Sequence, residues 1–112
     1  PQQEVEVDVN GYTRDWREIS LKFREKHNYT CERCGVKVMN PFESEFIQVH
    51  HRNGDKTDNH ESNLECLCIK CHSEVDDTHR RNFSTKAQQG LIQEFLLNYG
   101  CERFKGRNGE LF

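Results

Sequence analysis

The sequence of 112 residues contains 16 Lys and Arg, 19 Asp and Glu, 6 His and 6 Cys. This length predicts a single domain over residues 1–112. Only 33% of the residues are hydrophobic, so we expect a small core that needs further support, for which the cysteines are the obvious candidates. No apolar run approaches the roughly 18–20 residues of a membrane span, which excludes a transmembrane helix and a membrane partner. No signal-peptide pattern is present, and we expect a cytoplasmic protein.

The formal net charge of −3 argues at first against a nucleic-acid-binding protein. The charges segregate, however, because acidic residues crowd the start and the middle of the chain, whereas basic residues gather near Arg80, Arg81 and Lys86 and again near residues 103–107. A phosphate backbone requires only a local basic face, and bound metal cations would add to that face. The charge therefore leaves nucleic acid open as a partner.

Two elements are expected between about residues 4 and 28. Residues 4–9 alternate polar and apolar side chains, the period of a half-buried strand. Residues 14–27 carry apolar side chains at helical spacing, with Thr13 as a candidate N-cap and Asp15 favourable in the first turn. We expect the aromatic side chains of this helix to pack on the core.

The middle of the sequence predicts two strands followed by a helix. Residues 46–51 and 64–67 are short apolar stretches typical of strands, and the polar residues 52–63 between them indicate a loop. A helical pattern then extends from residue 69 to about residue 81.

A C-terminal helix is expected over about residues 85–99. Ser84 is its candidate N-cap, Gly90 weakens its middle, and Gly100 is a helix stop. The tail 101–112 is expected to be loose. Together these elements predict the α+β class.

Two C-x-x-C pairs, separated by 33 residues, are the strongest motif in the chain. They are Cys31 with Cys34, followed by Gly35, and Cys68 with Cys71. Two such turns supply the four thiolates of a closed tetrahedral zinc site. Two disulfides are the alternative, which the lack of secretory features disfavours.

This zinc is expected to be structural, because four cysteines leave no open position for water. It would clamp the segment near residue 31 to the start of the helix near residue 71. Its binding free energy, on the order of 10 kcal/mol, would offset the small core. Cys66 is assigned to the core and Cys101 to no role.

Three motifs around these pairs resemble the HNH endonuclease family, in its zinc-stabilised branch with two C-x-x-C pairs. They are Val49-His50-His51-Arg52, Asn63-Leu64 and Cys71-His72 entering a helix. The matching motifs run from Cys31 to about Asp76, less than half of the chain. The resemblance implies a small ββα-metal, treble-clef-like core over about residues 31–81, flanked by helices that do not belong to the motif.

The resemblance also implies roles for individual residues. His50 corresponds to a ligand of a catalytic metal ion and His51 to the general base that deprotonates water. Adjacent strand residues point to opposite sides unless the strand ends there, so neighbouring histidines suit two different tasks. His72 corresponds to a second metal ligand, and the third is Asp76, four residues further on, or alternatively His79.

Asn63 matches the middle letter of the motif. Its expected role is catalytic support: it hydrogen-bonds the loop between the strands and holds His51 in register. Asn59 is a nearby rival for this role. His27 and His60 are interpreted as surface histidines.

The resemblance implies hydrolysis of phosphodiester bonds in DNA, with 5′-phosphate and 3′-hydroxyl ends. One site meets one strand per encounter, so we expect nicking of duplex DNA. The lack of a helix-turn-helix and of a long basic arm predicts low sequence specificity. The catalytic ion is expected to be Mn²⁺ or Mg²⁺. Candidate contacts to DNA phosphates are Arg52, Lys70, Arg80 and Arg81.

Several alternatives stay open at the level of sequence. The chain can be a zinc-binding module that contacts nucleic acid or protein without cleaving it, or an enzyme that cleaves RNA. The sequence also leaves open whether the protein is a monomer or a dimer.

Overall fold

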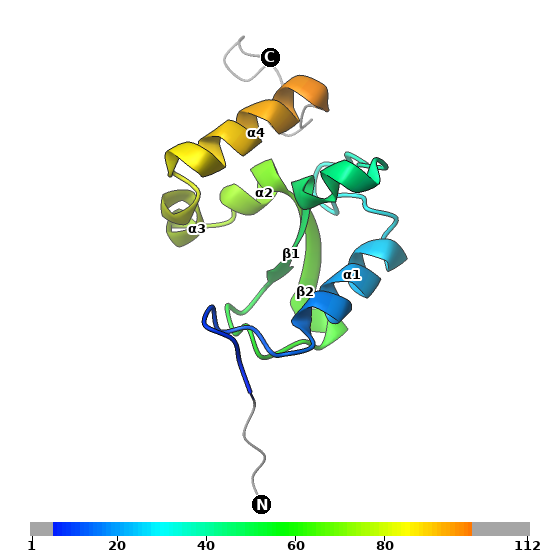
Figure 1. Ribbon diagram of the computed structural model, residues 1–112, viewed down its shortest axis with the longest axis vertical. Coiled ribbons are helices and arrows are strands. Elements are labelled where there is room, and N and C mark those ends of the chain that lie inside the picture. Colours follow the sequence, from blue (N-terminus) through cyan, green and yellow to red (C-terminus); the bar gives the residue numbers. More distant parts are fainter. Residues whose placement is uncertain (1–5, 100–112) are drawn as a thin grey trace, which may run out of the picture.

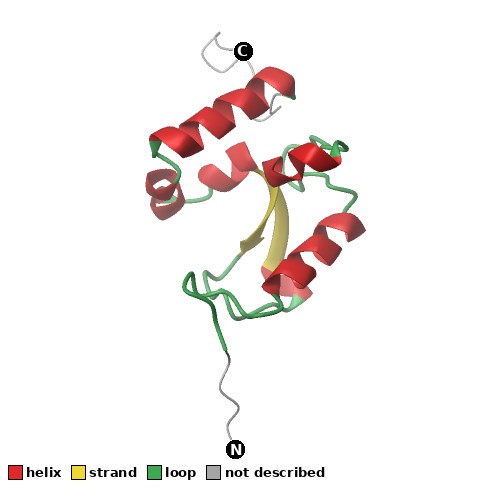
Figure 2. Cartoon of the chain, in the orientation of Figure 1, coloured by secondary structure: helices red, strands yellow, loops and turns green. Residues whose placement is uncertain are grey.

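The computed structural model describes residues 6–99, which form an α+β arrangement around a two-stranded sheet (Figure 1). In chain order, the elements are α1 (Trp16–Lys26), η1 (Pro41–Phe46), β1 (Ile47–His51), η2 (Glu61–Asn63), β2 (Leu64–Cys68), α2 (Ile69–Ser73), α3 (Asp77–Asn82) and α4 (Lys86–Asn98). Helix α1 packs against β1, and α4 packs against α2 at the other end of the sheet (Figure 2). The predicted α+β class is therefore confirmed.

The two strands are antiparallel, with Ile47 opposite Cys68 and His51 opposite Leu64. The ends of both strands lie within one residue of the predicted ranges 46–51 and 64–67. Every residue of β2 is buried, as are four of the five in β1, so both faces of the sheet are covered. The register places the cross-strand pair His50 and Glu65 at the end of the sheet that leads into the connecting loop.

The predicted helix over 14–27 is confirmed, but the prediction for its start is wrong. Helix α1 begins at Trp16 after Asp15, and Thr13 does not cap it, because the Thr13 hydroxyl donates instead to the Asp15 carboxylate. The strand predicted over 4–9 is also wrong for its described part. Residues 6–9 form only an isolated bridge between Val7 and Thr13, since the exposed acidic segment has no second strand to pair with.

The single helix predicted over 69–81 is two helices, α2 and α3, which is a correction with consequences for the site. Asp76 has extended backbone angles, and its carboxylate accepts a hydrogen bond from the His79 N–H at 2.8 Å. A side chain that caps a helix competes with continuation of the preceding one. Asp76 therefore starts α3 rather than lying inside one long helix.

Helix α4 matches its predicted range but not its predicted cap. The Thr85 hydroxyl accepts from the Gln88 N–H at 3.2 Å, whereas the Ser84 hydroxyl donates to the Arg81 carbonyl. Gly90 lies within the helix, where an added side chain would meet open space. The predictions for Gly100, Cys101 and the tail lie outside the described residues.

The core lies between the sheet and helices α1, α2 and α4. Its aromatic part joins η1 to α4, with the Phe46 and Phe95 rings 5.5 Å apart and both side chains fully buried. Phe23 of α1 is buried in the same core, as predicted, and Trp16 packs against that core while only partly buried. Among residues 6–99, no helix has the length and apolar character needed to span a membrane.

Candidate metal centre and active site

Four cysteine sulfurs form one compact cluster where β2 enters α2. The Sγ atoms of Cys31, Cys34, Cys68 and Cys71 all lie within 4.8 Å of one another. Those of Cys34 and Cys68 are 3.8 Å apart, far beyond the ~2.05 Å of a disulfide. Four sulfurs bound to one tetrahedral zinc at about 2.3 Å would be about 3.8 Å apart. The cluster therefore fits a structural ion such as zinc.

The local backbone supports this use of the sulfurs. In each pair, the N–H of the second cysteine donates to the first sulfur, at 3.4 Å for Cys34 and 3.3 Å for Cys71. Gly35 adopts a φ of +83°, which closes the first turn and which other residues rarely adopt. Contact with the Cys34 thiol raises the pKa of Cys31, but contacts with Cys68 and Cys71 outweigh this effect and lower the pKa to about 6. A thiol that ionises this readily is suited to metal binding.

Cys66 behaves differently from the four clustered cysteines. It is completely buried, and burial raises the pKa of its thiol to about 12. A thiol in such apolar surroundings stays protonated and packs as a small hydrophobic side chain. The structure thus bears out its assignment to the core.

A second cluster consists of three histidine rings. The ring centroids of His50, His72 and His79 form a nearly equilateral triangle, with separations of 5.2, 5.0 and 5.1 Å. One ring nitrogen from each lies within 4.8 Å of the others. The residues come from β1, α2 and α3, so the break between the two helices brings the third histidine to the first two.

Two of these rings are oriented by hydrogen bonds at Nδ1. The Nδ1 of His72 lies 2.8 Å from the Gln48 side-chain oxygen, and that of His79 lies 2.7 Å from the Asp76 carboxylate. A metal-binding histidine commonly uses one ring nitrogen for such a partner and the other for the metal. Asp76 was predicted as the third metal ligand, but its carboxylate contacts the His79 ring instead. The contact between Gln48 and the His72 ring was not predicted from the sequence.

Burial favours the neutral form of two rings in this cluster, those of His50 and His72. Burial, followed by the nearby His50 and His79, lowers the pKa of His72 to about 3. Burial and the neighbouring His79 also lower the pKa of His50 below its usual range. Neutral imidazole is the form that binds metal ions. Three imidazole rings around one point therefore fit a divalent cation of the transition series.

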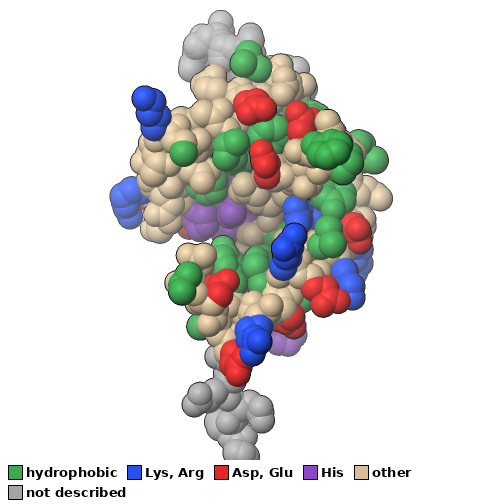
Figure 3. Space-filling view, in the orientation of Figure 1, with side chains coloured by type: hydrophobic (Ala, Val, Ile, Leu, Met, Phe, Trp, Pro, Cys, Tyr) green, Lys and Arg blue, Asp and Glu red, His purple; other side chains and the backbone are tan. Residues whose placement is uncertain are grey.

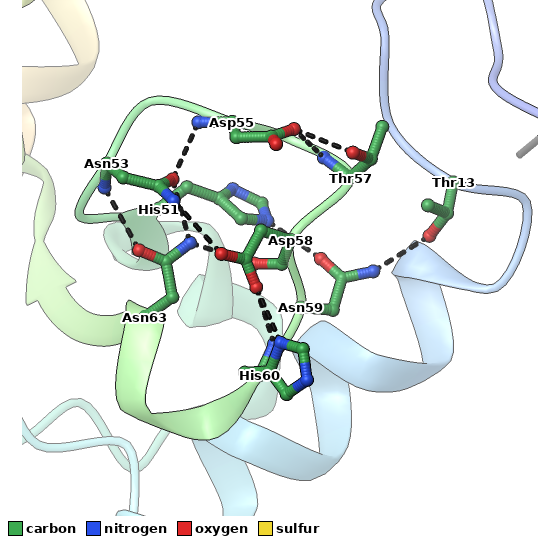
Figure 4. A network of polar contacts seen from close by, with 9 residues as sticks. All are labelled: Thr13, His51, Asn53, Asp55, Thr57, Asp58, Asn59, His60 and Asn63. Carbon is green, nitrogen blue, oxygen red and sulfur yellow. Dashed lines mark hydrogen bonds and ion pairs between the residues drawn. The ribbon is translucent and has the colours of Figure 1, made fainter.

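His51 faces a different set of partners from its neighbour His50. Its Nε2 lies 2.8 Å from the side-chain oxygen of Asn59, whose amide nitrogen donates to the Thr13 hydroxyl at 2.9 Å. The His51 ring packs against Trp16, with centroids 4.5 Å apart. Figure 4 shows Asn59 lying between His51 and Thr13. The rival asparagine thus makes the direct contact to His51.

Asn63 organises the loop rather than the ring of His51. Its oxygen accepts from the Asn53 N–H at 3.0 Å, and its amide nitrogen donates to the Asn53 side chain and to the Asp58 carbonyl (Figure 4). Its carbonyl accepts from the Arg52 N–H directly after β1. The loop-bracing part of its predicted role therefore matches its contacts.

Both histidine groups open onto one cleft of about 720 Å³. Its walls include His50, His51, His72 and His79, with Tyr12 and Trp16 on the N-terminal side. Figure 3 shows histidine side chains gathered in a hollow between the part of the molecule that contains α3 and the loops at the other end. The two adjacent histidines reach the same cleft because β1 ends at His51. His27 and His60 do not line it.

A buried ion pair connects the cysteine cluster to the histidine cluster. Arg33, between Cys31 and Cys34, donates to both oxygens of Glu65 at 2.8 and 2.9 Å. Glu65 is only 5% exposed and is the cross-strand partner of His50. Burial opposes the charge of Glu65, but its bonds to Arg33 dominate and lower its pKa. The sequence offered no signal for this pair.

The four basic residues suggested for DNA lie outside the cleft lining, and three of them contact carboxylates. Lys70 pairs with Glu74 at 3.1 Å, Arg80 contacts Glu74 and Asp77, and Arg52 lies 3.8 Å from Glu32. Arg81 is exposed on α3. The cations that line the cleft are instead Arg24 and Lys56.

Comparison with known proteins gives one informative similarity. No family model and no solved structure match the chain. The Zorya protein ZorE of Escherichia coli strain Crooks is 41% identical over 99 residues, which are 88% of this chain and 26% of ZorE. The chain thus spans about a quarter of the length of the curated relative that it matches.

Proposed function

We propose that the protein is a metal-dependent DNA endonuclease of the HNH type, which hydrolyses phosphodiester bonds and nicks duplex DNA with low sequence specificity. The observation that carries the proposal is the convergence of His50, His72 and His79 beside His51 in one cleft. Three clustered imidazoles and a separate histidine at the same opening are the parts that metal-assisted hydrolysis needs. The products are expected to carry 5′-phosphate and 3′-hydroxyl ends.

In this proposal, His50, His72 and His79 hold the divalent ion through their ring nitrogens. When bound, the ion supplies charge stabilisation at the scissile phosphate and the leaving oxygen. Gln48 and Asp76 fix two of the rings, so the ligand atoms are oriented before the ion arrives. His79 serves as the third ligand, and Asp76 supports it.

His51 takes the proton from the attacking water. Its Nε2 faces the Asn59 oxygen, which only accepts hydrogen bonds, so Nε2 carries the proton and Nδ1 carries the lone pair. A neutral imidazole placed beside the attacking water can accept its proton. Asn63 contributes by bracing the loop that follows His51.

The donor set bears on which metal ion acts. Three imidazoles favour borderline ions, whereas Mg²⁺ prefers oxygen ligands. We therefore expect Mn²⁺ to support cleavage better than Mg²⁺. The structural zinc is assigned to the four cysteines, whose closed ligand set leaves no position for substrate.

DNA is expected to enter along the cleft, with Arg24 and Lys56 near phosphates on its walls. Arg52, Lys70, Arg80 and Arg81 would contribute from its surroundings, and Arg81 most of all because the other three contact carboxylates. One site per chain meets one strand at a time, so a single encounter produces a nick. The similarity to the Zorya protein ZorE extends a Zorya-related role to this chain as part of the proposal.

The test is relaxation of supercoiled plasmid by the zinc-loaded protein with Mn²⁺, with Mg²⁺, and with EDTA. We expect nicked circles with Mn²⁺, fewer with Mg²⁺ and none with EDTA. His51→Ala is expected to lower the rate at least about 100-fold, because general-base catalysis contributes that much. His60→Ala is the matched control, since the His60 side chain is 86% exposed and outside the cleft.

The result that would overturn the proposal is equal cleavage by His51→Ala and the parent, with zinc content unchanged. Absence of cleavage under every divalent ion would favour a non-catalytic zinc module instead. A labelled RNA of the same sequence, assayed in parallel, decides whether the polymer is DNA.

A further inference from the structure

The segment from Tyr12 to Trp16 approaches His51 by ring contacts and by a chain of hydrogen bonds. Trp16, the first residue of α1, lies against the His51 ring, and the Tyr12 ring stacks on Trp16 at 5.4 Å and lies 6.0 Å from the His51 ring. Thr13 reaches His51 through Asn59. None of these N-terminal residues lies within the cysteine and histidine motifs between residues 31 and 76. The segment therefore forms a wall of the cleft beside the His51 ring.

The hydrogen bonds in this wall have a fixed direction. The Asp15 carboxylate only accepts, so the Thr13 hydroxyl donates its single hydrogen to Asp15 at 2.7 Å. The hydroxyl can then only accept a hydrogen bond from Asn59, so the amide nitrogen of Asn59, and not its oxygen, must face Thr13. The amide oxygen of Asn59 then faces His51 and accepts from Nε2–H. Asp15 and Thr13 thus determine which way the amide points.

We propose that Thr13 and Asp15 are positioning residues, which hold His51 in the tautomer with its proton on Nε2 and its lone pair on Nδ1. The consequence for catalysis rests on the proposed role of His51 as general base. An imidazole with the other tautomer would direct its lone pair at Asn59 instead of at water. Through these hydrogen bonds, Asp15, Thr13 and Asn59 hold His51 in one tautomer, as a carboxylate does for the general base of a catalytic triad.

The first measurement requires neither DNA nor a catalytic metal ion. In zinc-loaded, ¹⁵N-histidine-labelled protein at about pH 8, where an ordinary imidazole is neutral, long-range ¹H–¹⁵N spectra report the His51 tautomer. We expect Nε2–H in the parent. Thr13→Val removes the hydroxyl while keeping the shape, so the Asn59 amide can rotate and the Nδ1–H form appears. Thr13→Ser is expected to restore the parent spectrum.

Thr57→Val is the matched control. The Thr57 hydroxyl donates to the Asp55 carboxylate at 2.6 Å, the same kind of bond, in a loop position that makes no hydrogen bond to His51 (Figure 4). It is expected to leave the tautomer unchanged. A parent ring with its proton on Nδ1, or a Thr13→Val spectrum identical to that of the parent, would overturn the proposal.

The nicking assay then measures the effect on catalysis. Thr13→Val is expected to lower kcat about 10- to 100-fold with KM unchanged, because the hydroxyl orients the base without touching substrate. Thr13→Ser is expected to recover most of the rate. If the parent does not nick DNA at all, the proposed function is wrong, but the tautomer measurement still tests the positioning of His51 independently. A changed tautomer with an unchanged kcat would contradict the positioning role.

Discussion

Replacing Arg33 by Ala tests the buried ion pair between the cysteine cluster and the histidine cluster. The variant leaves the Glu65 carboxylate without its bidentate partner on a side chain that is only 7% exposed. Breaking a buried pair typically lowers the free energy of unfolding by about 3–5 kcal/mol. Because the Arg33 side chain is 35% exposed, we expect a loss of about 2–3 kcal/mol for this variant.

The assay is urea unfolding of the zinc-loaded protein, followed by circular dichroism at neutral pH. Lys22→Ala is the matched control, because Lys22 pairs with Glu18 on the exposed face of α1, where such pairs contribute about 0.3–0.5 kcal/mol. In a double-mutant cycle, Glu65→Gln should recover part of the loss in the Arg33→Ala background. A loss below about 0.5 kcal/mol for Arg33→Ala would refute the reasoning, because it would mean that the buried carboxylate needs no partner.

The same pair predicts a pH dependence with a definite sign. Because the pKa of Glu65 is lowered in the folded protein, its stabilising contribution is present above the ordinary carboxylate range and is lost as pH falls through the lowered pKa. Without Arg33, burial would raise that pKa instead. As the pH falls, the stability difference between the parent and Arg33→Ala should therefore shrink, starting at the raised pKa of Glu65 in the variant and continuing down to the lowered pKa in the parent. A difference that stays constant with pH would contradict this assignment.

Three further predictions address the core, a helix cap and the cysteines. Phe95→Ala should destabilise the protein by about 3–5 kcal/mol, whereas Leu97→Ala, at a side chain that is 81% exposed, should change thermal unfolding little. Thr85→Ala should cost about 1 kcal/mol through loss of the α4 cap and Ser84→Ala much less, so equal losses in urea unfolding would place the cap wrongly. Alkylation mapped by mass spectrometry at about pH 8 should leave Cys66 unmodified in the folded protein, because its pKa is about 12 and it is buried; rapid modification would contradict its place in the core.

The sequence predicted the parts of the fold that depend on local pattern. The two strands, α1 and α4 follow from hydrophobic period, and the cysteine cluster follows from two C-x-x-C turns. The break between α2 and α3 was missed because the helical pattern continues through it, while the Asp76 side chain competes for the backbone of His79. That break also decides which side chain stands beside His50 and His72, so the error in secondary structure became an uncertainty about the third ligand.

Contacts between distant segments could not be predicted from spacing. The hydrogen bonds from Arg33 to Glu65 and from Asn59 to Thr13 join residues 32 and 46 positions apart. The acidic start of the chain suggested a strand, yet the residues just after it pack behind His51. Only the three-dimensional arrangement shows that the N-terminal segment belongs to the site.

The central claim is that one divalent ion binds between the rings of His50, His72 and His79. Crystals of the zinc-loaded protein soaked in Mn²⁺ and measured at the manganese absorption edge test it directly. The account predicts an anomalous peak inside the triangle of rings, at about 2.0–2.3 Å from three ring nitrogens and distinct from the zinc peak at the cysteines. A manganese peak elsewhere, or a triangle that stays empty at saturating Mn²⁺, would contradict it.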